Sequence, residues 1–185
     1  MSRKTLLTII FFILFLAMMP LAAYTLLHFG TKCPPNEPCL IPVWFAPVVY
    51  APSGVLFAGL AFVLRDVLQR LAGLYLSLIA VIFGTILSYI YVAPELAIAA
   101  CSAYLLSELS DTIIYSILQR YNWILAVFIS ASVGLLIDSL VFLHLAFHSL
   151  MFLEGQIIGK MWMVILSLPL IHLLRRKLFV KIIPV

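Results

Sequence analysis

The chain has 185 residues, of which 65% are hydrophobic and only 10% are charged, and its mean hydropathy is +1.23. A soluble domain is about half apolar and about a quarter charged, so this composition excludes an ordinary soluble protein and indicates an integral membrane protein. The net charge of +4 is explained by the basic loops that orient such a protein in the lipid bilayer. We expect no nucleic-acid partner, because the basic residues are not interleaved with aromatic residues.

Six apolar segments of about twenty residues or more are each long enough to cross the hydrocarbon core of a bilayer as a helix. They predict a single all-α domain over residues 1–185, built as a bundle of six transmembrane helices. Because the connections after the first are short, successive helices should be antiparallel neighbours. The expected helices cover residues 5–29, 43–64, 73–92, 96–118, 123–147 and 156–174.

Basic residues are concentrated on one side of the predicted bundle. An even number of helices places both termini on that side, together with the loops that contain Arg65, Arg70 and Arg120. By the positive-inside rule this side is cytoplasmic, which predicts a multi-pass protein of the cell inner (plasma) membrane with cytoplasmic N- and C-termini. The basic residues expected at the termini are Arg3, Lys4, Arg175, Arg176, Lys177 and Lys181.

Residues 30–42 read GTKCPPNEPCLIP and form the first external loop of this topology. Their prolines exclude a helix and predict an ordered turn or a short lid. Cys33 and Cys39 lie on the side of the membrane where oxidation is possible. A disulfide between them and a pair of free thiols are both compatible with the sequence.

Polar residues line one face of the fourth predicted helix. Residues three and four apart share a helix face, so four residues form one stripe, flanked by Ser107: Tyr104, Glu108, Asp111 and Tyr115. A carboxylate at a helix centre opposes membrane insertion by roughly 2.5–3.5 kcal/mol, so an anchor helix gains nothing from it. The stripe predicts a substrate-binding face, on which a flat heterocycle stacks on the rings and donates N–H groups to the carboxylates. The alternative is a hydrogen-bond network that only holds helices together.

The fifth predicted helix carries a third carboxylate near the membrane centre. Ser130, Gly134, Asp138 and Phe142 follow one another at intervals of four and therefore share a face. The small residues of this face permit close helix approach, and Asp138 is a candidate for the substrate site.

Basic residues that could balance these acids lie on two other helices. Lys160 is one turn from Gln156 in the sixth predicted helix, and it pairs with Asp138 or Glu108 or extends to the membrane surface. Arg65 and Asp66 follow the second predicted helix. They belong either to a solvated basic loop or to an inner gate that closes with a carboxylate.

The chain contains no HExxH motif, no Ser-His-Asp order and no phosphate-binding glycine loop. The sequence therefore predicts neither an enzyme nor a cofactor. His144 and His148 are one turn apart, but no third ligand follows them, and we expect no metal site.

Four motifs in order resemble the VUT family of vitamin uptake transporters, which includes transporters of queuosine precursors. They are residues 51–73 (APSGVLFAGLAFVLRDVLQRLAG), 106–120 (LSELSDTIIYSILQR), 130–147 (SASVGLLIDSLVFLHLAF) and 155–160 (GQIIGK). The resemblance implies a six-helix membrane protein that imports a deazaguanine base used to make queuosine or archaeosine.

Donor and acceptor counts give each candidate residue a role toward such a base. Glu108 would accept the ring N–H and amino group as a bidentate pair, with Tyr104 or Tyr115 stacking on the ring. Asp138 would bind a second edge or a coupling proton, and Gln156 a carbonyl group. The alternative is a substrate-binding subunit for a vitamin or nucleobase that needs a separate energising module. A coupling subunit or a second copy of the chain is a possible partner in either case.

Overall fold

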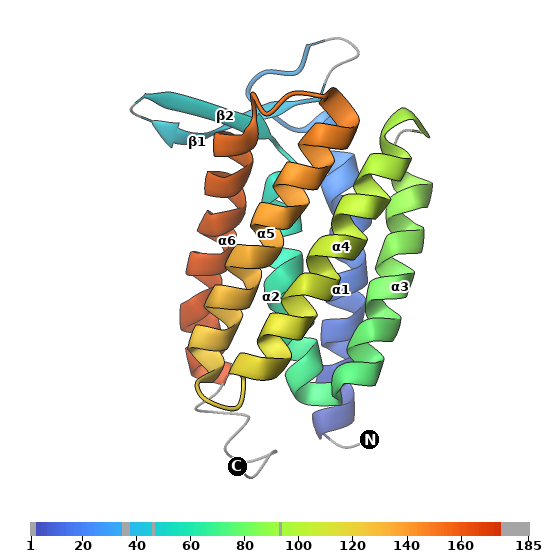
Figure 1. Ribbon diagram of the computed structural model, residues 1–185, viewed down its shortest axis with the longest axis vertical. Coiled ribbons are helices and arrows are strands. Elements are labelled where there is room, and N and C mark those ends of the chain that lie inside the picture. Colours follow the sequence, from blue (N-terminus) through green and yellow to red (C-terminus); the bar gives the residue numbers. More distant parts are fainter. Residues whose placement is uncertain (1–2, 35–37, 46, 93, 175–185) are drawn as a thin grey trace.

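Six helices form one bundle in the computed structural model, which describes residues 3–34, 38–45, 47–92 and 94–174 (Figure 1). A two-stranded antiparallel hairpin covers one end of the bundle. The strands are β1 (Leu40–Phe45) and β2 (Val48–Pro52). The helices are α1 (Arg3–His28), α2 (Val55–Ala72), α3 (Leu74–Tyr91), α4 (Pro94–Leu118), α5 (Trp123–Phe147) and α6 (Leu153–Leu174).

The prediction of a helix over residues 43–64 was wrong. Residues 43–52 belong mainly to the hairpin, and the helix begins at Val55 and continues to Ala72. Pro42 and Pro52 have no backbone N–H to donate to a helical hydrogen-bond ladder, and the β-branched Ile41 and Val43 beside Pro42 favour a strand. Five helices are long and apolar enough to cross a membrane: α1, α3, α4 over Leu96–Leu118, α5 and α6.

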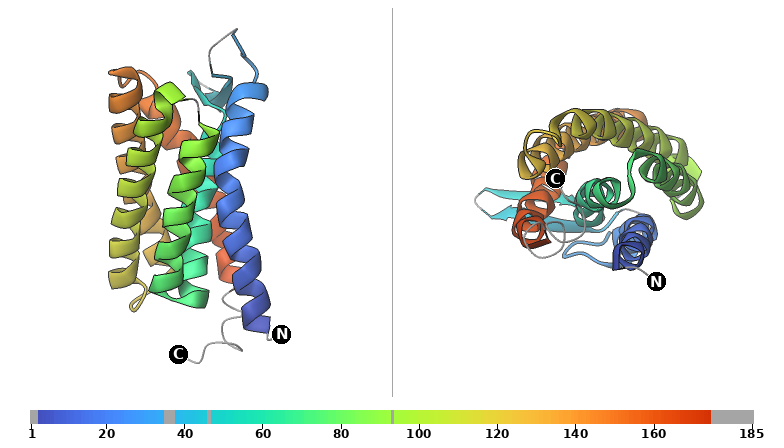
Figure 2. Two further views of the ribbon diagram at one scale, coloured as in Figure 1. Left: turned by 90° about the vertical axis from the view of Figure 1, so that its right-hand side faces the viewer. Right: turned by 90° about the horizontal axis from the view of Figure 1, so that it is seen from below.

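Helix α2 is not among the helices that are long and apolar enough to cross a membrane, and it lies at the centre of the bundle (Figure 2). It contacts each of the other five helices. Arg65 and Asp66 are fully buried on it rather than in a solvated loop, which corrects the expectation that Arg65 belongs to a basic loop. A helix surrounded by protein keeps charged side chains away from lipid, so α2 does not need a uniformly apolar sequence.

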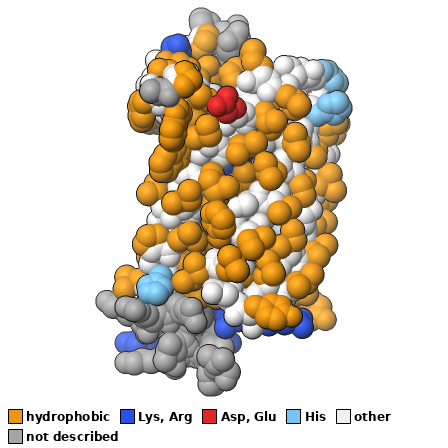
Figure 3. All heavy atoms as spheres, turned by 60° about the vertical axis from the view of Figure 1, so that its left-hand side comes forward, with side chains coloured by type: hydrophobic (Ala, Val, Ile, Leu, Met, Phe, Trp, Pro, Cys, Tyr) orange, Lys and Arg blue, Asp and Glu red, His pale blue; other side chains and the backbone are white. Residues whose placement is uncertain are grey.

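The two ends of the bundle differ in what they expose. Helix α1 begins and α6 ends at the same end, here called the terminal end, and the hairpin marks the opposite end (Figure 1). Apolar side chains cover the flank between them, as lipid contact requires (Figure 3). Arg120 is exposed in the α4–α5 connection at the terminal end. The tail residues Arg175, Arg176, Lys177 and Lys181 lie outside the described residues.

The loop before the hairpin is tied to the bundle by a disulfide and by backbone hydrogen bonds. Cys33 and Cys39 are bonded to each other. The Cys39 amide donates to the Leu26 carbonyl of α1 over 2.8 Å, and the Ser53 amide donates to the Cys39 carbonyl over 2.9 Å. These contacts fix the start of α2 against the end of α1.

Two glycines bring the central helix close to its neighbours. A Cβ atom at Gly59 of α2 would lie 2.7 Å from the Lys160 Cα atom of α6. A Cβ atom at Gly134 of α5 would lie 2.9 Å from the Phe62 ring of α2 and 3.1 Å from the Cβ atom of Asp111. The resulting close contacts place Lys160 and Asp111 in the interior of the bundle.

Candidate functional site

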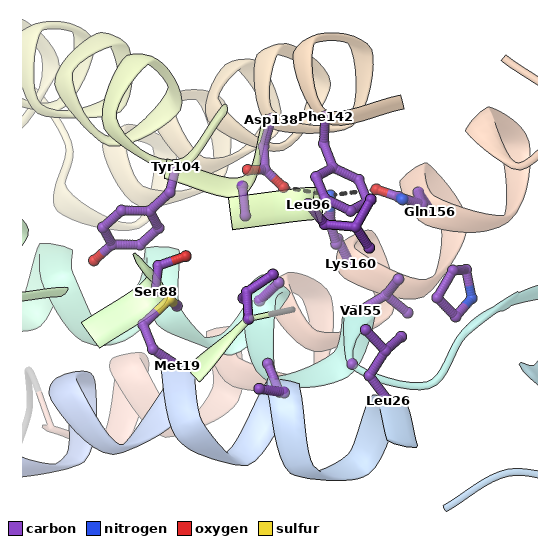
Figure 4. A pocket seen from close by; sticks show the side chains of 17 residues that line it. Met19, Leu26, Val55, Ser88, Leu96, Tyr104, Asp138, Phe142, Gln156 and Lys160 are labelled. Atoms are coloured by element: carbon purple, nitrogen blue, oxygen red, sulfur yellow. Dashed lines mark hydrogen bonds and ion pairs between the residues drawn. The ribbon is translucent and has the colours of Figure 1, made fainter. Parts of the chain in front are cut away.

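A cavity of about 140 Å³ lies in the half of the bundle next to the hairpin (Figure 4). All six helices contribute to its wall, each through residues near its hairpin end. Most of this wall is apolar, and residues such as Met19, Val55 and Leu96 line it. A 150 Å³ apolar cavity is known to hold benzene, so the space admits about one ring unless side chains of the wall move.

One side of the cavity is ionic. The Lys160 ammonium of α6 donates to Asp138 Oδ2 over 2.6 Å, to Ser139 Oγ over 2.8 Å and to Gln156 Oε1 over 2.8 Å. Its three donors are therefore all used. Lys160 is 2% exposed and Asp138 is 17% exposed. Within the described part of the chain, Asp138 Oδ1 and the Gln156 amide nitrogen have no hydrogen-bond partner, so both remain available to a solute.

The opposite side of the cavity is formed by Tyr104 and Ser88 (Figure 4). Tyr104 is buried, and its ring packs near Phe15 with the centroids 6.5 Å apart. Its hydroxyl group has no hydrogen-bond partner among the described residues. The cavity thus has a carboxylate and an amide on one side, Tyr104 and Ser88 on the other and apolar walls between them.

A second polar group, the Arg65 cluster, lies deeper in the bundle and consists of Arg65, Asp66, Glu108 and Asp111. Arg65 Nε contacts Glu108 Oε2 at 3.2 Å, and Arg65 Nη2 contacts Asp66 Oδ1 at 2.9 Å and also Asp111 Oδ2. All four side chains are 0% exposed. The fully buried guanidinium therefore joins α2 to α4 through the carboxylates of Glu108 and Asp111, and it also pairs with Asp66 of its own helix.

Neutral side chains complete the Arg65 cluster. Arg65 Nη1 donates to Gln69 Oε1 over 2.9 Å, and Gln69 Nε2 donates to Ser116 Oγ of α4 over 2.8 Å. Ser130 of α5 donates to Asp66 Oδ2 over 3.1 Å. The cluster therefore joins three helices.

The structure divides the predicted stripe of α4 between the two groups. All of its members face the interior, as the spacing predicts, but among them only Tyr104 lines the cavity. Glu108 and Asp111 bind Arg65, and the Tyr115 ring centroid lies 5.8 Å from the guanidinium carbon. Ser107 is buried and donates to the Tyr104 carbonyl over 2.9 Å.

The remaining candidates are placed as follows. Asp138 and Gln156 line the cavity, and Lys160 pairs with Asp138 rather than with Glu108. His144 and His148 lie near the hairpin end of α5, with ring centroids 6.3 Å apart.

Sequence reasoning missed several residues that build these sites. A single serine such as Ser88 in an apolar helix gives no signal, and neither does the apolar wall contributed by α1. Ser139 was missed as a partner of Lys160 because the contact joins two helices. Gln69 could have been found, since it lies one turn after Arg65 on the same face.

An apolar outer surface, long helices, buried ion pairs and a largely apolar cavity with an ionic side together define a multi-pass membrane protein with room for a small solute. Residues 88–180, half of the chain, match the sequence model of the family described as "putative vitamin uptake transporter". The chain belongs to this family, which confirms the resemblance seen in its motifs. No curated protein and no solved structure matches the chain.

Proposed function

We propose that this protein imports a deazaguanine base, a precursor of queuosine or archaeosine, and binds it in the cavity between Tyr104 and Asp138, where side chains of the wall move to admit the second ring of the base. One observation carries the proposal. The cavity is lined by residues of all six helices and presents a carboxylate oxygen and an amide nitrogen that have no partner among the described residues, together with an aromatic ring. A flat base that carries N–H donors and a carbonyl group requires such a site: the carboxylate accepts from the N–H groups, the amide donates to the carbonyl, and the ring contacts the flat face.

The structure favours Asp138 over Glu108 as the acceptor for the base. Asp138 lines the cavity, whereas Glu108 is in contact with Arg65 and does not line it. Oδ1 of Asp138 can accept an N–H of the guanine-like edge, and both oxygens can accept if Lys160 moves aside. Because Gln156 Oε1 already accepts from Lys160, its amide nitrogen is the part that would donate to the base carbonyl.

We further propose that the hairpin end faces the outside of the cell and that the protein lies in the inner (plasma) membrane. Disulfides persist in oxidising compartments, and the Cys33–Cys39 disulfide lies at the hairpin end. The exposed Arg3, Lys4 and Arg120 lie at the other end, as the positive-inside rule expects of a cytoplasmic face. A base would then enter the cavity from the outside.

Thiol labelling tests this orientation. In a Cys101→Ser background, a membrane-impermeant maleimide added to intact cells is expected to label the protein only after reduction. The reason is that Cys33 and Cys39 are then the two cysteines left, and they are bonded to each other. A Cys39→Ser variant should be labelled at Cys33, which is exposed, without reduction. Labelling that requires broken cells in every case would place the hairpin end in the cytoplasm.

We also propose that the chain transports without a dedicated energising module. Such a subunit would dock on a face of small residues, for which Ser130 and Gly134 are only a poor candidate in the sequence. Both residues are buried against other helices of the bundle, so that face is already occupied.

Complementation tests the function directly. Bacteria that neither make nor import the deazaguanine precursor would express this chain and receive a trace of precursor, and their tRNA would then be assayed for queuosine. We expect queuosine with the unmodified chain and with the control variant Glu154→Gln, whose side chain is exposed outside the cavity. An absence of queuosine despite confirmed membrane insertion would exclude this solute or show that a partner is needed.

A further inference from the structure

The charges of the Arg65 cluster do not balance. Three carboxylates, on Asp66, Glu108 and Asp111, surround a single guanidinium group, and all four side chains are 0% exposed. If every group were ionised, the cluster would carry two uncompensated negative charges in the bundle interior. A buried charge without a partner is normally removed by protonation, because the ionised form is far costlier than the neutral acid.

Two oxygen atoms of the cluster are suited to hold a proton. Glu108 Oε1 and Asp111 Oδ1 are buried, and neither has a hydrogen-bond donor among the described residues. Of the two acids, Glu108 has the longer contact to Arg65, through Oε2 at 3.2 Å. A proton on Glu108 Oε1 would therefore weaken the ion pairing of Arg65 less than a proton on Asp111 would.

Other charged groups nearby do not supply the missing compensation. Lys160 is already paired with Asp138, and Arg70 forms no ion pair with the three acids in the part of the chain that the structure describes. The titratable side chains of α1 and α3 are exposed. Among the described residues, the other titratable groups that interact with the cluster are Tyr104 and Tyr115 of α4 and Asp138 of α5, and none of them is a cation.

We propose that the Arg65 cluster is a proton-binding site, that Glu108 carries the exchangeable proton, and that this proton couples solute uptake to a proton gradient. The coupling part of the inference rests on the proposed transport function, whereas the protonation part does not. The ligand is a proton that binds to Glu108 Oε1 and is released again, with no change in oxidation state.

The position of the cluster explains how its protonation would act on the cavity. Tyr104 and Glu108 are one turn apart on the same face of α4, and Tyr104 lines the cavity while Glu108 holds α4 to α2. Protonation of Glu108 replaces its ion pair with Arg65 by a weaker hydrogen bond from the guanidinium to a neutral acid. The contact between α2 and α4 is then weaker on the side of the cavity that faces the terminal end. An imported solute has to leave the cavity toward that end, which is the proposed cytoplasmic side.

Infrared spectroscopy of the purified protein tests the protonation without any solute. We expect a C=O stretching band of a protonated carboxylic acid at neutral pH, and we expect this band to be absent from Glu108→Gln. Glu154→Gln is the control, since Glu154 is exposed at the hairpin end. If Glu108→Gln does not fold, Glu108→Asp keeps an acid and should shift the band instead. A band that neither variant changes would overturn the assignment.

Proteoliposomes test the coupling. With a labelled deazaguanine base and a pH difference of one unit, one coupled proton allows accumulation of about tenfold. Glu108→Gln should lower this ratio to about one, while Glu154→Gln keeps it. A sodium gradient that drives accumulation in place of the proton gradient, or tenfold accumulation by Glu108→Gln, would overturn the coupling. If no variant moves the base but the infrared band behaves as expected, the proposed solute fails and the proton site stands.

Discussion

Replacing Arg65 with glutamine is expected to remove most of the folded protein from the membrane. The guanidinium is the shared partner of Asp66, Glu108 and Asp111, and none of the four side chains is exposed. Removing one partner of a buried ion pair typically costs about 3–5 kcal/mol, because the other charge stays buried without compensation. Since α2 contacts every other helix, a disturbance at Arg65 reaches the whole bundle.

The measurement is the yield of monodisperse protein after extraction in mild detergent, together with its midpoint of thermal unfolding. Arg120→Gln is the matched control, because this arginine is exposed in the α4–α5 connection and should change neither quantity. Combining Arg65→Gln with Glu108→Gln and Asp111→Asn should restore part of the yield, since fewer unpaired charges remain. An Arg65→Gln protein as stable as the parent would show that the cluster does not hold α2 to α4.

The sequence predicts α5 very well because its limits are local. An apolar run begins directly after Asn122, whose side-chain oxygen accepts hydrogen bonds from the Ile124 and Leu125 amides at 3.0 and 3.2 Å. The helix covers Trp123–Phe147, as expected from residues 123–147. Length and composition suffice where a span contacts lipid along its whole length.

The same reasoning fails for α2, because hydropathy does not distinguish an apolar strand from an apolar helix. Residues 43–52 are as apolar as a span, yet they form a hairpin whose strands contain Pro42 and Pro52. The charged residues of α2 also resemble those that usually follow the end of a transmembrane helix. The charged residues Arg65 and Asp66 of α2 are tolerated because the other five helices surround α2 and separate it from lipid. This central position depends on all five helices and cannot be derived from the sequence of α2 alone.

The candidate site could be predicted in part. The spacing of residues on α4 correctly predicted which side chains face the interior. It could not show which acid lines the cavity, because that depends on Arg65 of α2 lying opposite Glu108 and Asp111. The pairing of Lys160 with Asp138 likewise depends on how closely α6 approaches, which Gly59 of α2 allows.

Replacing Asp138 with asparagine is expected to weaken binding of a deazaguanine base by about 10- to 100-fold. A hydrogen bond to a charged group contributes about 1.5–3 kcal/mol, and each 1.4 kcal/mol corresponds to about tenfold in affinity. The change should also lower stability, because Lys160 is only 2% exposed and would lose Asp138, its one ionic partner among the described residues. The two effects therefore have to be separated.

A double-mutant cycle separates them. Asp138→Asn and Lys160→Gln each leave one buried or half-buried charge without its partner, so each alone should lower the thermal midpoint. The double variant removes both charges and should recover most of the stability. It should not recover binding of a labelled deazaguanine base, because the carboxylate oxygen facing the cavity is still missing. Recovery of binding together with stability would mean that Asp138 only positions Lys160, and that the acceptor for the base is another residue such as Glu108.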